Sequence, residues 1–164
     1  MKTIINKNLL IVLTFVNIIT PAIAEARDNC LTIKDVLESN KPAGTFANTA
    51  WSVYEAKDSY ADWSGSELVF SEEKIRESKV SLKGYFYWLA DGESFGCEKV
   101  SGVFNKKTSV LRIKTIGVST YELSDSTFYK AKLSPDGEIF SGSWNGQNTT
   151  NGKWKARRVN LSEN

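Results

Sequence analysis

An alternation of apolar and polar residues in the segment 80–90, VSLKGYFYWLA, is the feature that most limits how this chain folds. Apolar or glycine residues fill every second position from Val80 to Ala90. Because successive side chains of a β-strand point to opposite faces, the segment predicts a long strand with one strongly apolar face. Asp91-Gly92 follows at once and is typical of a two-residue hairpin turn.

The same two-residue period recurs along most of the chain. Further strands are predicted at 94–105, 109–118, 128–133, 138–144 and 152–159, with weaker signals at 51–56 and 67–71. Most are separated by tight turns, of which Ser134-Pro135-Asp136-Gly137 is typical. The pattern predicts a mainly β fold, an antiparallel up-and-down meander of about eight strands. Such a meander exposes two edges unless it closes, so we expect a small barrel or half-barrel.

One short helix is predicted close to the N-terminus. Thr32 is suited to cap its first turn, and Asp35 stands three residues later, as in a capping box. Leu31 and Val36 occupy the positions of a hydrophobic staple around that turn. The segment Lys41-Pro42-Ala43-Gly44 ends the helix.

The first residues have the pattern of a secretory signal peptide. Lys2 and Lys7 precede an apolar run at 9–20, and Ala22-Ile23-Ala24 provides a small-residue cleavage site. The run is shorter than the roughly 20 apolar residues of a spanning helix. We therefore expect a periplasmic or secreted chain that begins near Glu25, with no membrane insertion after the leader is removed.

The domain organisation that follows is simple. It consists of a signal peptide at 1–24, an N-terminal segment with the short helix at 25–43, a β-barrel domain at 44–159 and a flexible tail at 160–164. The chain has two cysteines, Cys30 and Cys97, which we expect to pair in an exported protein. The alternative is a reactive thiol, which would need a nearby base, and the sequence has no histidine.

Charge argues against a nucleic-acid partner. The leader carries two of the 21 basic residues and none of the 19 acidic ones, so the remaining chain is formally neutral. Nucleic-acid binders usually carry a basic patch, whereas here the charges alternate in sign along the sequence. The local pairs Lys106-Lys107 and Arg157-Arg158 are interpreted as solvated strand ends.

Residues 141–154, SGSWNGQNTTNGKW, place Gly-x-Trp twice. On one predicted strand Gly142 and Trp144 share a face, and on the next Gly152 and Trp154 share a face. If both faces point inward, the repeat is core packing, in which a glycine makes room for a neighbouring indole. We favour that interpretation over a ligand-binding motif.

Catalytic chemistry is restricted by the residue types present. The lack of histidine excludes Ser-His and Cys-His nucleophilic systems and any histidine-metal site. The acidic stretch 55–63 does not have the spacing of a calcium loop. We expect no metal, no cofactor and no enzymatic activity. Two acids facing the interior would instead support the hypothesis of an enzyme with two catalytic carboxylates. Tyr54, Tyr60 and Trp63 either form an exposed aromatic patch or cover the open end of the barrel.

Three ionisable residues share the face of apolar neighbours on their strands: Glu55, Glu98 and Arg158. A buried charge is costly unless paired, so a bridge from Arg158 to either acid is one expectation. The other is that one of the three orients a ligand in an aromatic-lined cavity. The candidate ligand-binding residues are Glu55, Trp88, Glu98, Trp144, Trp154 and Arg158.

The order of a leader, a short helix, an early Trp51 and a meander with glycine-aromatic strands resembles the small secreted barrels of the lipocalin and avidin superfamily. The resemblance covers residues 44–159 as a pattern, and no individual site residue is carried over from it. It implies a barrel that holds a small ligand, or a protein partner at the barrel mouth.

Two functions follow as expectations. The first is an exported, non-enzymatic binding protein for a small apolar or amphipathic molecule, or for a protein partner at the mouth. The alternative is a protein-directed inhibitor or immunity-type factor with a fully packed core. Burial of every tryptophan would disfavour ligand carriage, whereas a cavity of roughly 300 Å³ or more would support it. Asn148 and Asn160 match glycosylation acceptors, which matter only in a eukaryotic source.

Overall fold

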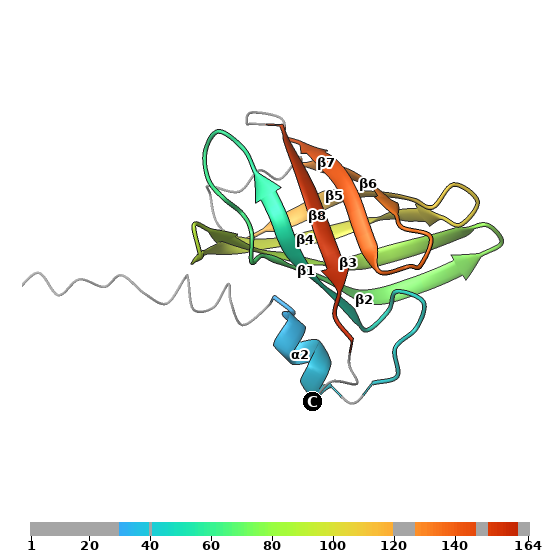
Figure 1. The fold of residues 1–164 in the computed structure, drawn as a ribbon. Helices are drawn as coiled ribbons and strands as arrows, with labels where there is room; N and C mark the ends of the chain where they lie inside the picture. Colours follow the sequence, from blue (N-terminus) through green and yellow to red (C-terminus); the bar gives the residue numbers. More distant parts are fainter. Residues whose placement is uncertain (1–29, 40, 120–126, 147–150, 161–164) are drawn as a thin grey trace, which may run out of the picture.

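In a computed structural model that describes residues 30–39, 41–119, 127–146 and 151–160, the chain forms a closed antiparallel barrel in the order β1 to β8 (Figure 1). The elements are α2 (Ile33–Glu38), β1 (Thr49–Lys57), β2 (Glu67–Arg76), β3 (Lys79–Ala90), β4 (Glu93–Asn105), β5 (Val110–Val118), β6 (Phe128–Leu133), β7 (Ile139–Asn145) and β8 (Gly152–Arg158). Each strand pairs with its neighbours in sequence, and β8 pairs with β1. The predicted meander is confirmed, and it closes completely.

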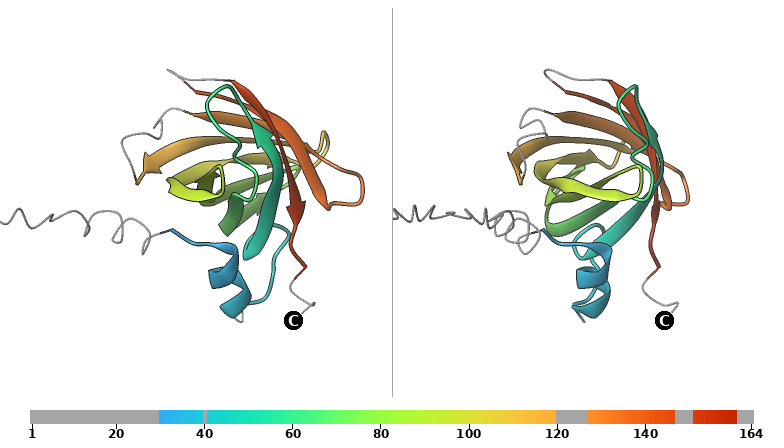
Figure 2. Two further views of the ribbon diagram at one scale, coloured as in Figure 1. Left: turned by 60° about the vertical axis from the view of Figure 1, so that its left-hand side comes forward. Right: turned by 90° about the vertical axis from the view of Figure 1, so that its left-hand side faces the viewer.

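The barrel has two different ends, which can be followed in Figures 1 and 2. The short connections β2–β3, β4–β5 and β6–β7 lie together on the right of Figure 1, and we call this the turn end. The β1–β2 loop and the β3–β4 hairpin lie on the left, at the loop end. The hairpin has positive φ at both Asp91 (52°) and Gly92 (86°), as a two-residue turn of this type requires.

Phe46 fills the interior at the turn end. Its ring lies 4.7 Å from the ring of Phe104 and 6.2 Å from that of Phe140, measured between centroids. The Glu73 carboxylate holds the segment in place, because it accepts hydrogen bonds from the backbone N–H of Thr45 at 3.2 Å and of Phe46 at 2.9 Å. Phe46, Phe104 and Phe140 are all buried at this end.

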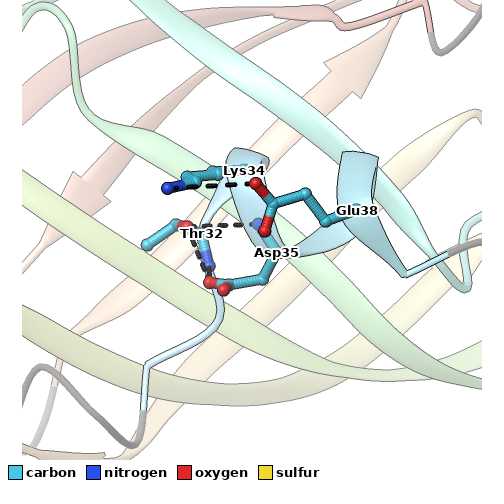
Figure 3. A network of polar contacts seen from close by, with 4 residues as sticks. All are labelled: Thr32, Lys34, Asp35 and Glu38. Carbon is cyan, nitrogen blue, oxygen red and sulfur yellow. Dashed lines mark hydrogen bonds and ion pairs between the residues drawn. The ribbon is translucent and has the colours of Figure 1, made fainter.

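The short helix begins with the predicted capping box (Figure 3). The Thr32 hydroxyl accepts from the Asp35 backbone N–H at 3.4 Å, and the Asp35 carboxylate accepts from the Thr32 backbone N–H at 2.7 Å. An exposed ion pair between Lys34 and Glu38, 3.8 Å apart, spans the next turn. A helix this short depends on tertiary packing for most of its stability.

The helix covers the outer surface of β1 and β2. Val36 packs on Ala50 and Val69, which point outward from their strands and are nevertheless fully buried. The predicted disulfide between Cys30 and Cys97 is present, with 6.1 Å between the Cα atoms, and it fastens the start of this segment to the outer face of β4. The N-terminal segment is therefore attached to the barrel at two separate places.

The repeated Gly-x-Trp is core packing, as predicted. Trp144 and Trp154 both face the interior and are 8% and 1% exposed. A methyl group at Gly152 would come within 1.9 Å of the Trp144 indole, so glycine is what lets this ring lie flat against β8. At Gly142 a side chain would collide with the backbone of the neighbouring strand, since a methyl group there would lie 2.0 Å from the Lys130 carbonyl oxygen.

Replacing Gly152 with alanine is expected to lower the free energy of unfolding by about 2 kcal/mol, because the rigid Trp144 ring must move to admit the methyl group. Urea denaturation measures the change. Gly117→Ala is the matched control, since the nearest atom to its added methyl group is the Cβ of Lys99 at 3.9 Å. Equal stability of the two variants would show that the contact between glycine and indole is not tight.

Candidate functional site

A buried carboxyl group lies inside the barrel where β4, β5 and β6 adjoin. Glu98 on β4 is 2% exposed. Its Oε2 accepts a hydrogen bond from the Tyr129 hydroxyl of β6 at 2.5 Å and another from the Thr115 hydroxyl of β5 at 3.0 Å. The other oxygen, Oε1, takes part in neither of these two bonds. Strand alternation brings Glu98 inward together with Val100 and Phe104.

The environment of this carboxyl favours its neutral form. Burial raises the pKa of Glu98 from the ordinary value of 4.5 to about 7, although hydrogen bonds from Tyr129, Thr115 and Trp88 lower it. Burial also raises the pKa of the Tyr129 hydroxyl well above its ordinary value, and the charge of Glu98 adds to that effect. Tyr129 therefore remains a neutral donor, and Glu98 is the group that changes its charge near neutral pH.

Aromatic rings surround the carboxyl group. The Phe86 ring stacks on Trp88 at 4.6 Å and lies 4.7 Å from Tyr129. Trp144 is 6.3 Å from Trp88, and Trp154 meets Phe86 edge to face at 5.6 Å. The interior around Glu98 is thus an aromatic environment with a few hydroxyl groups, the composition typical of small-molecule sites.

The β1–β2 loop closes over this end of the barrel. Trp63 is 9% exposed and packs edge to face on Trp88 at 5.8 Å. Its backbone N–H donates to the Ala56 carbonyl at 2.7 Å, and the Asp91 N–H donates to the Asp62 carbonyl at 2.8 Å, which ties the loop to the β3–β4 hairpin. Of the two predicted roles, Trp63 therefore takes that of covering the mouth.

The two tyrosines of the same sequence stretch lie elsewhere. Tyr60 stacks on Trp63 at 6.0 Å and remains 68% exposed at the rim. Tyr54 points outward from β1, and the Arg157 guanidinium lies 5.5 Å above its ring. The three aromatic residues do not form a single patch.

Two indole N–H groups are buried without a hydrogen-bond partner in the part of the chain that the structure describes. They are Nε1 of Trp63, in the loop over the mouth, and Nε1 of Trp154, on β8. Most buried polar groups in proteins are hydrogen-bonded, so unsatisfied donors are uncommon and costly. The interior thus combines two unused donors with an acid that changes its charge.

Glu55 does not belong to this site. The register between β1 and β8 shifts between Val53 and Glu55, so that Ala56 rather than Glu55 points inward after the bulge. Glu55 is exposed and forms an ion pair with Lys155 at 2.7 Å. The expected bridge from Glu55 to Arg158 is therefore wrong, because strict alternation along β1 takes no account of the bulge.

Arg158 lies in the other half of the barrel. Its guanidinium stands 5.8 Å from the Trp51 ring, and Trp51 packs on Phe140 at 4.4 Å, in the layer that Phe46 fills. Glu98 is held by hydroxyl groups, and Arg158 takes part in no ion pair within the described residues. The second expected bridge, from Glu98 to Arg158, is also wrong.

The structure thus brings together Glu98, Trp88 and Trp144. Trp154 contacts Phe86, which stacks on Trp88. Glu55 and Arg158 lie apart from this group. Sequence reasoning missed Tyr129 and Thr115. A signal was present, because each alternates with apolar residues on its strand and so belongs to an inward face. That both reach the same carboxylate depends on the register of β4, β5 and β6.

Among the described residues, Glu98 is the one buried acid. The same ranges contain no cluster of three or more potential metal ligands of the histidine, cysteine and acid types. None of the helices described is both long and apolar enough to cross a bilayer. The predicted signal peptide at 1–24, residues 161–164 of the predicted tail at 160–164, and Asn148 lie outside the described residues.

The sequence matches no known protein family and no curated protein.

Proposed function

We propose that this is an exported, non-enzymatic binding protein that takes a small amphipathic molecule into the loop-end half of its barrel, where Glu98 contacts the polar end of the ligand. One observation carries the proposal. Glu98 is buried among aromatic rings and has no cationic partner among the residues described. A buried acid costs stability, and an aliphatic side chain would fill the same space without that cost.

Other features support the same function. Trp88, Trp144 and Phe86 supply apolar walls, and the unused indole N–H groups of Trp63 and Trp154 are further donors for a polar ligand atom. Eight-stranded up-and-down barrels have an interior of the size that holds one small ligand in lipocalins. The Cys30–Cys97 disulfide is compatible with the oxidising environment of an exported protein.

A second function has its own supporting observation. All five tryptophans are buried: Trp51, Trp63, Trp88, Trp144 and Trp154. This burial disfavours ligand carriage and fits a protein-directed inhibitor, which acts through its surface alone. The exposed ring of Tyr60 at the rim would then contact the partner, since aromatic residues are enriched at such interfaces.

Titration of tryptophan fluorescence with decylamine, decanol and decanoate tests the first function. We expect the amine and the alcohol to bind and the carboxylate to bind at least about tenfold more weakly, because two carboxylates would face each other. Glu98→Gln is expected to weaken decylamine binding about tenfold, through loss of a charge-assisted hydrogen bond.

Arg158→Ala is the matched control, because Arg158 lies in the layer filled by Phe46 and Phe140. It should leave decylamine binding unchanged. Native mass spectrometry of protein purified from its own source provides an independent test. Failure of all three probes, together with a co-purifying protein and no retained small molecule, would favour the inhibitor.

A further inference from the structure

The charged residues on the four adjoining strands β5 to β8 are all basic, and β7 has none. Strands β5 to β8 contain eight lysine and arginine residues and no aspartate or glutamate. Along the sequence the charges alternate in sign, so this grouping is not visible there. The acidic residues of the described elements lie instead on α2, β1, β2 and β4.

The strand register sets these cations side by side. Residues directly opposite one another on β5, β6, β7, β8 and β1 form one line across the outer surface, which we call the basic row: Arg112, Lys130, Ser143, Lys153 and Lys57. All five side chains are exposed. Adjacent strands are about 4.8 Å apart, so the row extends for roughly 19 Å around the barrel. Lys114 and Lys132 flank it on β5 and β6.

One carboxylate approaches the basic row in the part of the chain that the structure describes, since Asp62 is directly opposite Lys57, and the charge of that lysine contributes to the lowered pKa of Asp62. None of its four cations takes part in an ion pair there. Arg112 is directly opposite Lys130, and Lys153 is directly opposite Lys57. Like charges in directly opposed positions destabilise a sheet. Asp62 relieves the second pair in part, whereas Arg112 and Lys130 stay directly opposed, as is expected when the face serves an anionic partner.

Apolar side chains adjoin the basic row on one side. Phe128 on β6 is directly opposite Lys114, and it is 60% exposed. Ile116, two residues further along β5 on the same face, is 47% exposed. Diagonal neighbours of this kind lie about 7 to 8 Å apart. The surface therefore pairs a line of cations with two projecting apolar groups.

We propose that this face docks on an anionic lipid surface, with the basic row against the lipid phosphates and Phe128 and Ile116 inserted between headgroups. Each lysine or arginine near such a surface adds favourable energy, and exposed apolar side chains add more on insertion. A second copy of the same face is excluded by repulsion between like charges. A nucleic acid would use the cations but gains nothing from an exposed Ile116.

The proposal does not rest on the ligand-binding function, since none of these residues lines the interior. Sedimentation of the full mature protein with vesicles tests it. We expect binding to vesicles of equal parts phosphatidylcholine and phosphatidylglycerol, no binding to pure phosphatidylcholine, and a loss of binding as salt is raised.

The double variant Lys130→Glu and Lys153→Glu is expected to lower the vesicle partition coefficient at least about tenfold. Lys74→Glu and Lys79→Glu make the same change in charge on exposed positions of β2 and β3 and should have a much smaller effect. Lys130→Gln and Lys153→Gln provide a milder version if charge reversal impairs folding, which circular dichroism would reveal.

Phe128→Ser separates a lipid surface from other polyanions. On a membrane it is expected to weaken vesicle binding severalfold while binding to heparin and to single-stranded DNA stays the same. Three outcomes would overturn the proposal: tighter binding to heparin or DNA than to anionic vesicles, an equal loss in the β2 and β3 control variant, or vesicle binding that is insensitive to Phe128.

Discussion

Breaking the disulfide between Cys30 and Cys97 is expected to lower the free energy of unfolding by about 4 kcal/mol, the largest effect of any single change proposed for this protein. The bond joins residues 67 positions apart, so its loss frees a long loop in the unfolded chain. In the folded protein it also holds the start of the segment that carries α2 over β1 and β2. Urea denaturation with and without reductant measures the difference.

The double variant Cys30→Ser and Cys97→Ser serves as the control. It should have the stability of the reduced protein and show no further response to reductant. A loss below about 1 kcal/mol in both cases would mean that the unfolded chain is not restrained by the bond, contrary to the loop-entropy account.

Stability is also expected to fall by about 3 kcal/mol as the pH rises from 4.5 to 7, through Glu98 alone. The pKa of this carboxyl is raised in the folded state, so between these values the native protein holds a proton that the unfolded chain releases. The contribution of Glu98 is therefore fully present below pH 4.5, decreases across the interval and is lost above about pH 7.

Glu98→Gln isolates this effect, because an amide stays neutral over the whole range. The difference in unfolding free energy between the two proteins should change by about 1.4 kcal/mol per pH unit within the interval, in favour of the glutamine variant as the pH rises. Urea denaturation at a series of pH values provides the data. Other acids affect stability only below this interval, because their pKa values are lowered: Asp35, Asp62, Glu72 and Asp136. Parallel pH profiles for the two proteins would contradict the assignment to Glu98.

The inward positions of the site were largely predictable. Glu98, Trp88, Trp144 and Trp154 follow from strand alternation, and the structure places all four inside the barrel. Glu55 was misplaced because one bulge in β1 reverses the alternation from that point. Such a bulge leaves no clear mark in the sequence.

The contacts of Glu98 were less predictable than its position. Each of its hydroxyl partners is inward by the alternation on its own strand, yet Thr115 and Tyr129 are 17 and 31 residues away from Glu98 along the chain. Pairing the acid with Arg158 was reasonable for two charges of opposite sign on inward faces. The structure instead puts them in different layers of one interior.

The sequence by itself determined the strands, their turns, the helix cap and, outside the β1 bulge, which of the candidate side chains face inward, because these depend on neighbours a few residues apart. Tertiary structure alone decided the closure of the barrel, the partners of Glu98 and the alignment of Arg112, Lys130, Lys153 and Lys57 on one outer face. The physical reason is register. Lateral neighbours in a sheet come from different strands, and a shift of one residue in the pairing exchanges every contact between them.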